Sequence, residues 1–199
     1  GPANVFTDKA DRYTYSYDAA VLDPVTPAIV LRPETGEALS HAVRLCNENE
    51  MPLTVRGAGT NLSGGTVPHK EGAVIVTNAL SQILEINTQD MYAVVQPGVI
   101  TAKLAAAVEA QGLFYPPDPG SQAVSTLGGN VSENAGGLRG LKYGVTRDYV
   151  MGLQFFDVEG NSVKTGSKTV KCATGYNLTG LMVGSEGTLG VFNTITLKL

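Results

Sequence analysis

Cysteine is scarce in this sequence, with two residues among 199. Cys46 and Cys172 form neither a CxxC pair nor a spacing typical of metal ligands, so the pattern excludes a zinc-ribbon type of site and predicts no metal centre. Free cysteine is usually buried, and we expect both residues in the core. Two unpaired thiols also favour a reducing, cytoplasmic compartment.

Long hydrophobic runs and an excess of positive charge are also missing. No apolar run approaches the roughly 20 residues that span a bilayer, which predicts no transmembrane segment, and no secretory apolar stretch opens the chain. The charged residues comprise 14 Lys and Arg against 18 Asp and Glu, a net charge of −4. Without a broad basic field, nucleic acid is excluded as a partner. Gly1-Pro2 resembles the scar that a protease leaves after removal of a tag.

Glycine, by contrast, is abundant, with 24 residues among 199. The usual share is about 7%. The excess is concentrated in four segments, so it is positional and not a low-complexity bias. The segments are residues 56–65 (RGAGTNLSGG), 96–98 (QPG), 116–137 (PPDPGSQAVSTLGGNVSENAGG) and 184–190 (GSEGTLG). Their common character predicts a surface built from backbone amides, suited to a long phosphorylated cofactor.

The first part of the chain has the pattern of a small α/β unit. A short apolar strand is expected at 27–32, followed by a helix at 34–50 with Thr35 as its N-cap. Leu39, Val43 and Cys46 form one apolar row of this helix, and Ala38, Ala42 and Leu45 form the neighbouring row. Further strands are expected at 53–56 and 73–77. Strand, helix and strand in this order predict a βαβ-containing lobe.

The second part predicts an antiparallel sheet with helices on one side. Strands are expected at 92–96 and 189–199, and two strand-like runs within 149–165 flank a hairpin turn at 159–161. Helices are expected at 101–111 and 176–183. We therefore expect an N-terminal arm at 1–24, a first lobe at 25–85 and a second lobe at 86–199. The chain stops directly after a strand, which predicts a truncated or excised domain.

The first glycine segment follows a strand directly. Glycine reaches positive φ and allows close approach of the backbone, and successive N–H groups in such a turn bind anions, so a pyrophosphate fits. The segment is not the Rossmann fingerprint, because Leu62 replaces the third glycine, and it is not a P-loop, because no Lys-Ser/Thr follows. Arg56 pairs either with a phosphate or with a structural carboxylate.

The third segment combines stiffness with a lack of bulk. Residues 116–119 hold three prolines, which either end a strand or form a rigid wall against a flat ring. Residues 125–130 and 134–137 supply hydroxyls, amides and glycine pairs, which leave space for a planar ring with polar groups at its edge. In the fourth segment, Glu186 either accepts hydrogen bonds from a ribose hydroxyl or adenine amine, or is a solvated turn residue.

Taken together, the motifs of this sequence resemble the FAD-binding domain of the vanillyl-alcohol-oxidase, or PCMH-type, flavoproteins. The motifs that carry the resemblance are Arg56-Gly57-x-Gly59-Thr60, Pro97-Gly98, Pro117-Asp118-Pro119-x-Ser121, residues 125–130, Gly136-Gly137, residues 142–144 and residues 184–190. Within that superfamily the sequence is most similar to the group that contains the GlcD component of glycolate oxidase and D-lactate dehydrogenase. The resemblance implies an α+β fold: a small βαβ-containing lobe and a larger antiparallel-sheet lobe with flanking helices, with FAD between them.

The resemblance also implies which residues hold FAD. Around the pyrophosphate they are Arg56, Gly57, Ala58, Gly59, Thr60, Asn61, Gly64 and Gly65. Along the ribityl chain and isoalloxazine they are Pro117, Asp118, Ser121, Ser125, Thr126, Gly128, Gly129, Asn130, Ser132, Asn134, Ala135, Gly136 and Tyr143. Facing the adenosine half they are Pro97, Glu186, Gly187 and Val191. No histidine lies between Gly57 and Gly65, which favours noncovalent FAD.

The implied chemistry is hydride transfer from a 2-hydroxy acid to the flavin, in a dehydrogenase or oxidase acting on CH–OH groups. Members of this group continue into a substrate domain and a C-terminal segment, which carry the substrate-binding residues and are missing here. This chain alone is therefore expected to be inactive, and no catalytic residue is assigned. The missing domain or partner subunits of a full-length oxidase are the expected partners.

Three alternatives remain at this point. The first is an isolated or engineered flavin-binding module without turnover. The second is another superfamily member, such as an alkyl-glycerone-phosphate synthase or an enolpyruvyl reductase. The third is a domain whose glycine loops are purely structural. The run Lys142-Tyr143-Gly144-Val145-Thr146-Arg147-Asp148-Tyr149 matches the glycolate oxidase pattern and argues against the enolpyruvyl reductase.

Overall fold

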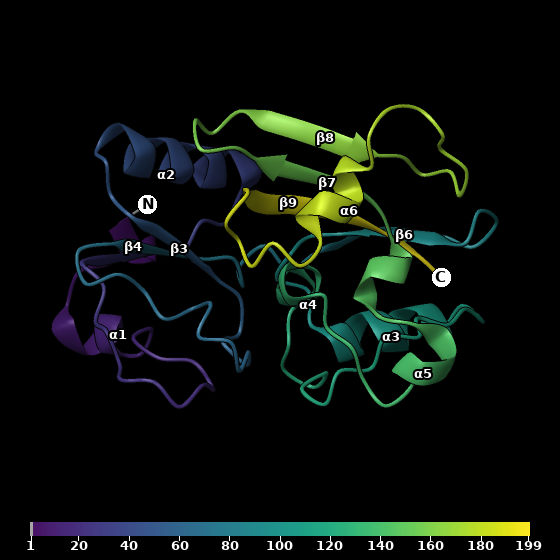
Figure 1. Ribbon diagram of the computed structural model, residues 1–199, viewed down its shortest axis with the longest axis horizontal. Helices are drawn as coiled ribbons and strands as arrows, with labels where there is room; N and C mark the ends of the chain where they lie inside the picture. Colours follow the sequence, from purple (N-terminus) through teal and green to yellow (C-terminus); the bar gives the residue numbers. More distant parts are fainter. Residues whose placement is uncertain (1) are drawn as a thin grey trace.

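The computed structural model describes residues 2–199, so Gly1 of the expected Gly1-Pro2 scar lies outside the described residues. Two β-sheets lie beside each other, the first in the left half of the view and the second in the right half (Figure 1). Helices cover both sheets. The α+β, two-lobed fold expected from the sequence is confirmed.

The first sheet has the strand order β1-β2-β4-β3. Its strands are β1 (Val5–Phe6), β2 (Ile29–Leu31), β3 (Leu53–Arg56) and β4 (Ala73–Val76). β2, β4 and β3 are parallel, as a βαβ unit requires, and β1 adds an antiparallel edge. All four residues of β4 are buried, which fits the central strand of a parallel sheet.

Helix α2 (Gly36–Glu48) connects β2 to β3 and packs where the two sheets meet. The Thr35 side chain accepts a hydrogen bond from the Ala38 N–H at 3.1 Å, which confirms the expected N-cap. Leu39 and Val43 are buried against Ile75 of the first sheet and Phe156 and Val191 of the second. Of the second predicted row, only Ala42 is buried, so the apolar face is narrower than expected.

The second sheet is antiparallel throughout, in the order β5-β6-β9-β7-β8. Its strands are β5 (Ile83–Asn87), β6 (Tyr92–Val95), β7 (Val150–Phe156), β8 (Ser162–Gly166) and β9 (Val191–Lys198). The hairpin turn expected at 159–161 joins β7 to β8. Because β9 lies at the centre, the last strand of the chain holds the sheet together.

Helices α3 (Thr101–Glu109) and α4 (Leu127–Glu133) cover one face of the second sheet. Leu104 and Val108 of α3 and Leu127 and Val131 of α4 are nearly inaccessible to solvent and pack on Val95, Ile195 and Leu197. The remaining elements are η1 (Pro2–Asn4), α1 (Lys9–Tyr13), α5 (Gly140–Tyr143), η2 (Thr146–Tyr149) and α6 (Leu178–Met182). This arrangement places the amino end of α4 beside the junction of the two sheets.

The chain passes from the first sheet to the second between Val76 and Ile83, because β5 belongs to the second sheet. The prediction that Cys172 is buried is wrong: it is exposed in the loop after β8, whereas Cys46 is buried. None of the helices described in residues 2–199 has the length and apolar character needed to cross a membrane.

Candidate functional site

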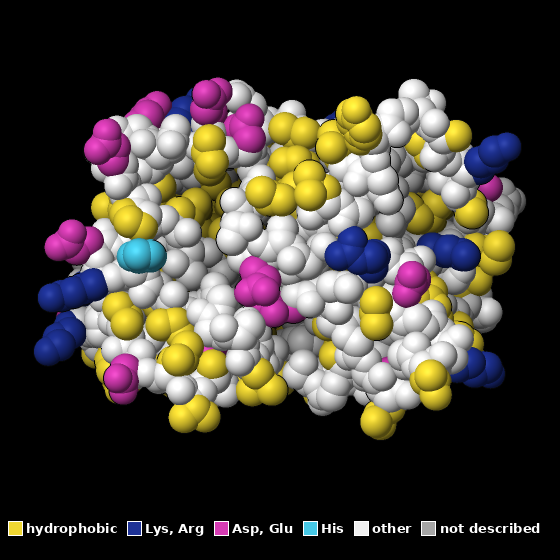
Figure 2. All heavy atoms as spheres, in the orientation of Figure 1, with side chains coloured by type: hydrophobic (Ala, Val, Ile, Leu, Met, Phe, Trp, Pro, Cys, Tyr) yellow, Lys and Arg dark blue, Asp and Glu magenta, His cyan; other side chains and the backbone are white. Residues whose placement is uncertain are grey.

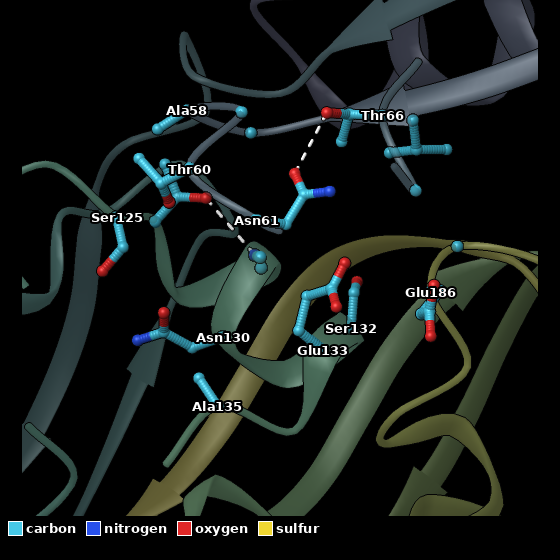
Figure 3. A pocket seen from close by; sticks show the side chains of 18 of the residues that line it. Ala58, Thr60, Asn61, Thr66, Ser125, Asn130, Ser132, Glu133, Ala135 and Glu186 are labelled. Carbon is cyan, nitrogen blue, oxygen red and sulfur yellow. Dashed lines mark hydrogen bonds between the residues drawn. The ribbon is translucent and has the colours of Figure 1, made fainter. Parts of the chain in front are cut away.

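A cavity of about 300 Å³ opens between the two sheets. Three of the glycine-rich segments meet there: the loop after β3, helix α4 with its flanks, and the loop after α6 (Figure 3). The remaining segment, at residues 96–98, contributes Pro97. Segments separated by more than a hundred residues in sequence therefore form one continuous wall.

Because glycine has no side chain, these glycine-rich segments come into contact with one another. A Cβ on Gly57 would overlap Oγ1 of Thr126, and one on Gly128 would lie 2.7 Å from Cβ of Pro97. Gly128 also donates its N–H to the Pro97 carbonyl at 2.7 Å. These contacts explain why α4 forms despite two glycines in its first turn: tertiary contacts and the Thr126 cap, which accepts from the Gly129 N–H at 3.3 Å, replace intrinsic propensity.

The N-terminal arm holds the first glycine loop from outside the cavity. Asp18 is 8% exposed, and its Oδ2 accepts a hydrogen bond from Asn61 Nδ2 at 2.7 Å. The Ala19 N–H donates to the Asn61 carbonyl at 3.1 Å, and Thr66 also donates to Asp18. The conformation of Asn61, which lines the cavity, is therefore fixed by residues that precede the first lobe predicted from the sequence.

Arg56 lies beneath the loop and does not line the cavity. Its Nη1 donates to the Tyr17 carbonyl at 2.6 Å, and its guanidinium lies against Gly59, where a Cβ would overlap it. Burial lowers the pKa of Arg56, while the neighbouring Asp18 raises it. Among residues 2–199 Arg56 forms no ion pair with a carboxylate; it supports the loop through the Tyr17 carbonyl and places a positive charge behind it.

Two carboxylates stand at the cavity wall. A Cβ on Gly65 would lie 3.2 Å from Glu133 Oε1 and 3.2 Å from Glu186 Oε2. Burial raises the pKa of Glu133, and the charges of Glu186 and Asp18 raise it further, while a hydrogen bond from Ser63 lowers it. Figure 2 shows an acidic patch where α4 and the loop after α6 meet in Figure 1. The loop amides would stabilise an anion bound here, and these carboxylates would repel it.

The loop that carries Glu186 is fixed by α4 and by Arg147. Gly184 and Glu186 donate their N–H groups to the carbonyls of Val131 and Ser132, each at 2.9 Å. Arg147 donates from its guanidinium to the carbonyls of Gly180 and Val183 and from its backbone to Asn134 Oδ1. Arg147 thereby ties the end of α6 to the end of α4.

Most of the residues predicted from the sequence to hold a cofactor come together at the cavity. Those that line it are Gly57, Ala58, Gly59, Thr60, Asn61, Gly65, Pro97, Ser121, Ser125, Thr126, Gly128, Gly129, Asn130, Ser132, Ala135, Gly136, Glu186 and Gly187. The structure does not bring the other predicted residues to the lining, and these are Arg56, Gly64, Pro117, Asp118, Asn134, Tyr143 and Val191.

The residues away from the lining have supporting contacts instead. Asp118 accepts from the Arg139 N–H at 3.0 Å and is packed against Gly137, so the stiff Pro117-Asp118 segment braces the loop after α4. Tyr143 stacks edge-on with Phe114, with 5.8 Å between ring centroids. Val191 faces a second, smaller cavity behind Gly187 and Gly190.

Sequence reasoning missed seven lining residues, which are Val55, Leu62, Thr66, Thr77, Glu133, Gly190 and Phe192. Leu62, Thr66, Glu133 and Gly190 lie within or next to the glycine segments, so their neighbours gave a usable signal. Val55, Thr77 and Phe192 lie at strand ends and carry no distinguishing pattern. The supporting roles of Asp18 and Arg147 were also missed.

The lining offers backbone amides, hydroxyls and two amide side chains. No group of three or more His, Cys, Asp or Glu residues suited to a metal gathers anywhere in residues 2–199. The glycines leave the cavity open, and its polar groups suit a ligand with phosphates and hydroxyls. Such a wall binds and orients a cofactor, and the chemistry must then come from that cofactor.

Comparison with known proteins agrees with this description. Residues 27–166 match the FAD binding domain family. The chain is 49% identical over 199 residues to glycolate oxidase subunit GlcD of Bacillus subtilis, covering all of this chain and 42% of that protein. It is 41% identical over 182 residues to D-lactate dehydrogenase of Anaerostipes hadrus, covering 92% of this chain and 38% of that protein. The chain thus spans about two fifths of the length of these relatives.

A solved structure of alkyldihydroxyacetonephosphate synthase superposes with a TM-score of 0.87 at 22% identity, covering 99% of this chain and 38% of that one. At this identity the likeness concerns the fold alone. The resemblance to PCMH-type flavoproteins drawn from the glycine motifs is confirmed, and FAD is the cofactor. The match covers more than half of the sequence, and the chain belongs to the FAD binding domain family.

Proposed function

We propose that this chain is the FAD-holding part of a flavin-dependent dehydrogenase or oxidase for small 2-hydroxy acids of the glycolate or D-lactate type. The observation that carries the proposal is the 49% identity with glycolate oxidase subunit GlcD over the whole chain. The structural likeness to an alkyldihydroxyacetonephosphate synthase does not support that activity equally well, because at 22% identity the likeness indicates only a shared fold.

Within the cavity we propose that the loop at Gly57–Asn61 and Gly65 holds the pyrophosphate. The glycine loop after β3 lines the cavity there, and the buried charge of Arg56 lies against Gly59 of this loop. The polar segment from Ser125 to Gly136 then lies along the ribityl chain and isoalloxazine, and Pro97, Glu186 and Gly187 face the adenosine. The other predicted residues, including Pro117, Asp118, Asn134 and Tyr143, act as supports.

We propose that FAD is bound noncovalently. His69 is exposed beyond the first glycine loop and does not line the cavity. The lining residue at the corresponding place in the loop is Thr60, whose hydroxyl is not a usual attachment point. A reducing, cytoplasmic setting is supported by the two free cysteines.

The bound flavin would supply the hydride acceptor. The residues of this chain would bind and orient it, but the described lining holds no pair of groups suited to bind a carboxylate and remove a hydroxyl proton. Positioning of the donor would therefore fall to the remainder of a longer protein or to partner subunits. The alternative function, a flavin-binding module without turnover, rests on the same lack of substrate-binding groups in the described lining.

Anaerobic bleaching of the flavin tests the proposal. Glycolate, D-lactate and L-lactate are added separately to the FAD-loaded chain and to the FAD-loaded longer protein. The proposal predicts bleaching of the longer protein by a 2-hydroxy acid and little or none of the chain alone. If no 2-hydroxy acid bleaches the longer protein, the proposed substrate class is wrong. Bleaching of neither protein would favour the binding module.

A further inference from the structure

A buried hydrogen-bonded cluster joins the first residue of α3 to the cavity wall. Thr101, Ser125 and Asn130 are 0%, 4% and 3% exposed. Asn130 Nδ2 donates to Thr101 Oγ1 at 2.8 Å. Thr101 Oγ1 lies 3.1 Å from the Ser125 carbonyl and 2.9 Å from Ser125 Oγ. Ser125 and Asn130 line the cavity, whereas Thr101 stands behind them.

The single hydroxyl proton of Thr101 sets the direction of these bonds. A carbonyl oxygen can only accept, so the bond to the Ser125 carbonyl requires Thr101 to donate. Its lone pairs are then left for donors, and the Nδ2 group of Asn130 satisfies one. The Asn130 amide is consequently held with its nitrogen toward α3.

The opposite end of the amide faces the cavity. In Figure 3 the Asn130 oxygen points upward, toward the loop that carries Thr60, and the nitrogen points to the left. The hydrogen bond that this amide forms within residues 2–199 is the one donated by Nδ2, and Oδ1 is not among the fully buried atoms without a partner, so it is accessible from the cavity. Once a ligand fills the cavity and excludes water, a carbonyl oxygen without a partner is costly, so the wall here favours a hydrogen-bond donor from the ligand.

We propose that Thr101 is a positioning residue that fixes the hydrogen-bonding polarity of this wall, so that Asn130 accepts from a ligand N–H or O–H. The proposal rests on the placement of FAD in this cavity. FAD carries such donors in the imide N–H of its ring and in its ribityl hydroxyls. Phosphoryl oxygens are acceptors only and are disfavoured here, which directs the pyrophosphate to the glycine loop instead.

Without the Thr101 hydroxyl, the amide loses its fixed orientation. Valine has nearly the same shape as threonine, so Thr101→Val leaves the packing of α3 intact and removes only the hydroxyl. Asn130 Nδ2 and Ser125 Oγ then lack their buried partner, and rotation of the amide by half a turn would present a donor to the cavity. The FAD donor that needs an acceptor is then left unpaired.

The test measures the Kd for FAD by flavin fluorescence in Thr101→Val, Thr101→Ser and a matched control, Thr179→Val. The Thr179 hydroxyl is also buried and bonded, to Thr165 Oγ1 at 2.9 Å, but lies away from the cavity. Thr101→Val should raise Kd about tenfold, the equivalent of one hydrogen bond. Thr101→Ser should restore most of the affinity, and Thr179→Val should stay within about twofold of the parent protein. The visible flavin spectrum should change only in Thr101→Val.

A double-mutant cycle with Asn130→Ala separates positioning from general damage. If Thr101 acts through Asn130, Thr101→Val should lose most of its effect on Kd when Asn130 is alanine. An equal loss of affinity in both backgrounds, or a Thr101→Val protein that binds FAD like Thr179→Val, would overturn the proposal while leaving the cofactor site in place. Absence of FAD binding by the parent protein would overturn both this proposal and the proposed function.

Discussion

Gly57 and Thr126 are in direct contact across the base of the cavity, and a Cβ on Gly57 would overlap Oγ1 of Thr126. Gly57 follows β3 of the first sheet, and Thr126 caps α4 on the second. The contact joins the two halves of the chain where the proposed pyrophosphate site lies. The glycine is required there because of the neighbour it meets, since its φ is not in the positive range.

Gly57→Ala should therefore force α4 away from the loop. We expect a loss of about 1–3 kcal/mol in stability and a clear rise in the Kd for FAD, because overpacking shifts backbone. Thermal melting and FAD titration measure the two effects. Gly120→Ala is the control, because nothing lies within 4 Å of a Cβ at Gly120. Equal behaviour of the two variants would contradict the close contact.

Asp18→Ala should weaken FAD binding although Asp18 does not line the cavity. Asp18 is the acceptor that holds Asn61, and its removal takes a charged partner from the half-buried donors of Asn61 and Thr66 at a cost of about 1–3 kcal/mol. We expect a lower melting temperature and a Kd raised several-fold. Asp23→Ala, an exposed change in the same arm, should change neither quantity. An unchanged Kd in Asp18→Ala would show that the arm does not shape the loop.

The affinity for FAD should rise as the pH falls from neutral toward the usual pKa of glutamate. Burial raises the pKa of Glu133, so this carboxyl takes up a proton above the usual range of glutamate. Protonation removes its repulsion of the phosphates. Because the pKa of Glu133 is raised in the folded state, the folded state binds the proton more tightly than the unfolded state. The stability of the protein without FAD should therefore increase slightly as pH falls through this window.

Glu133→Gln should flatten this pH dependence and bind FAD more tightly at neutral pH. Titrations of FAD at several pH values measure both effects, with Glu109→Gln on the exposed side of α3 as the control. A Glu133→Gln protein that keeps the full pH dependence would place the responsible group elsewhere.

Arg147→Ala should loosen the loop that carries Glu186. Its guanidinium holds the carbonyls of Gly180 and Val183, and hydrogen bonds from charged donors contribute about 1.5–3 kcal/mol. We expect a lower melting temperature and weaker FAD binding, with partial recovery in Arg147→Lys, which cannot reach both carbonyls in the same way. Lys164→Ala on exposed β8 is the control. Retention of full FAD affinity in Arg147→Ala would remove this residue from the account.

The sequence predicted those elements whose pattern is local. Thr35 and the spacing of Leu39 and Val43 define α2, and the alternation from Val191 to Leu197 defines β9. Helix α4 was missed because Gly128 and Gly129 oppose helix formation, and contacts with Pro97 and Gly57 together with the Thr126 cap make the helix favourable. Strands β1 and β5 are too short or too mixed in polarity to be recognised without their partners.

The same distinction holds for the candidate site. Glycine segments mark the loops that form the wall, and their order made the family recognisable. The residues that hold the wall in place, Asp18, Thr101 and Arg147, have common side chains and act over sequence distances of 13 to 48 residues. Arg56 shows the converse: its position next to the loop suggests a ligand contact, but packing turns its guanidinium behind the loop.

The most direct test of the central claim is the visible absorbance spectrum of the protein after incubation with FAD and removal of unbound cofactor, recorded before and after acid precipitation. The account predicts a flavin spectrum that stays with the folded protein and moves entirely to the supernatant on precipitation. Colour retained in the pellet would contradict noncovalent binding. A colourless protein after incubation would contradict the claim that this chain by itself holds FAD.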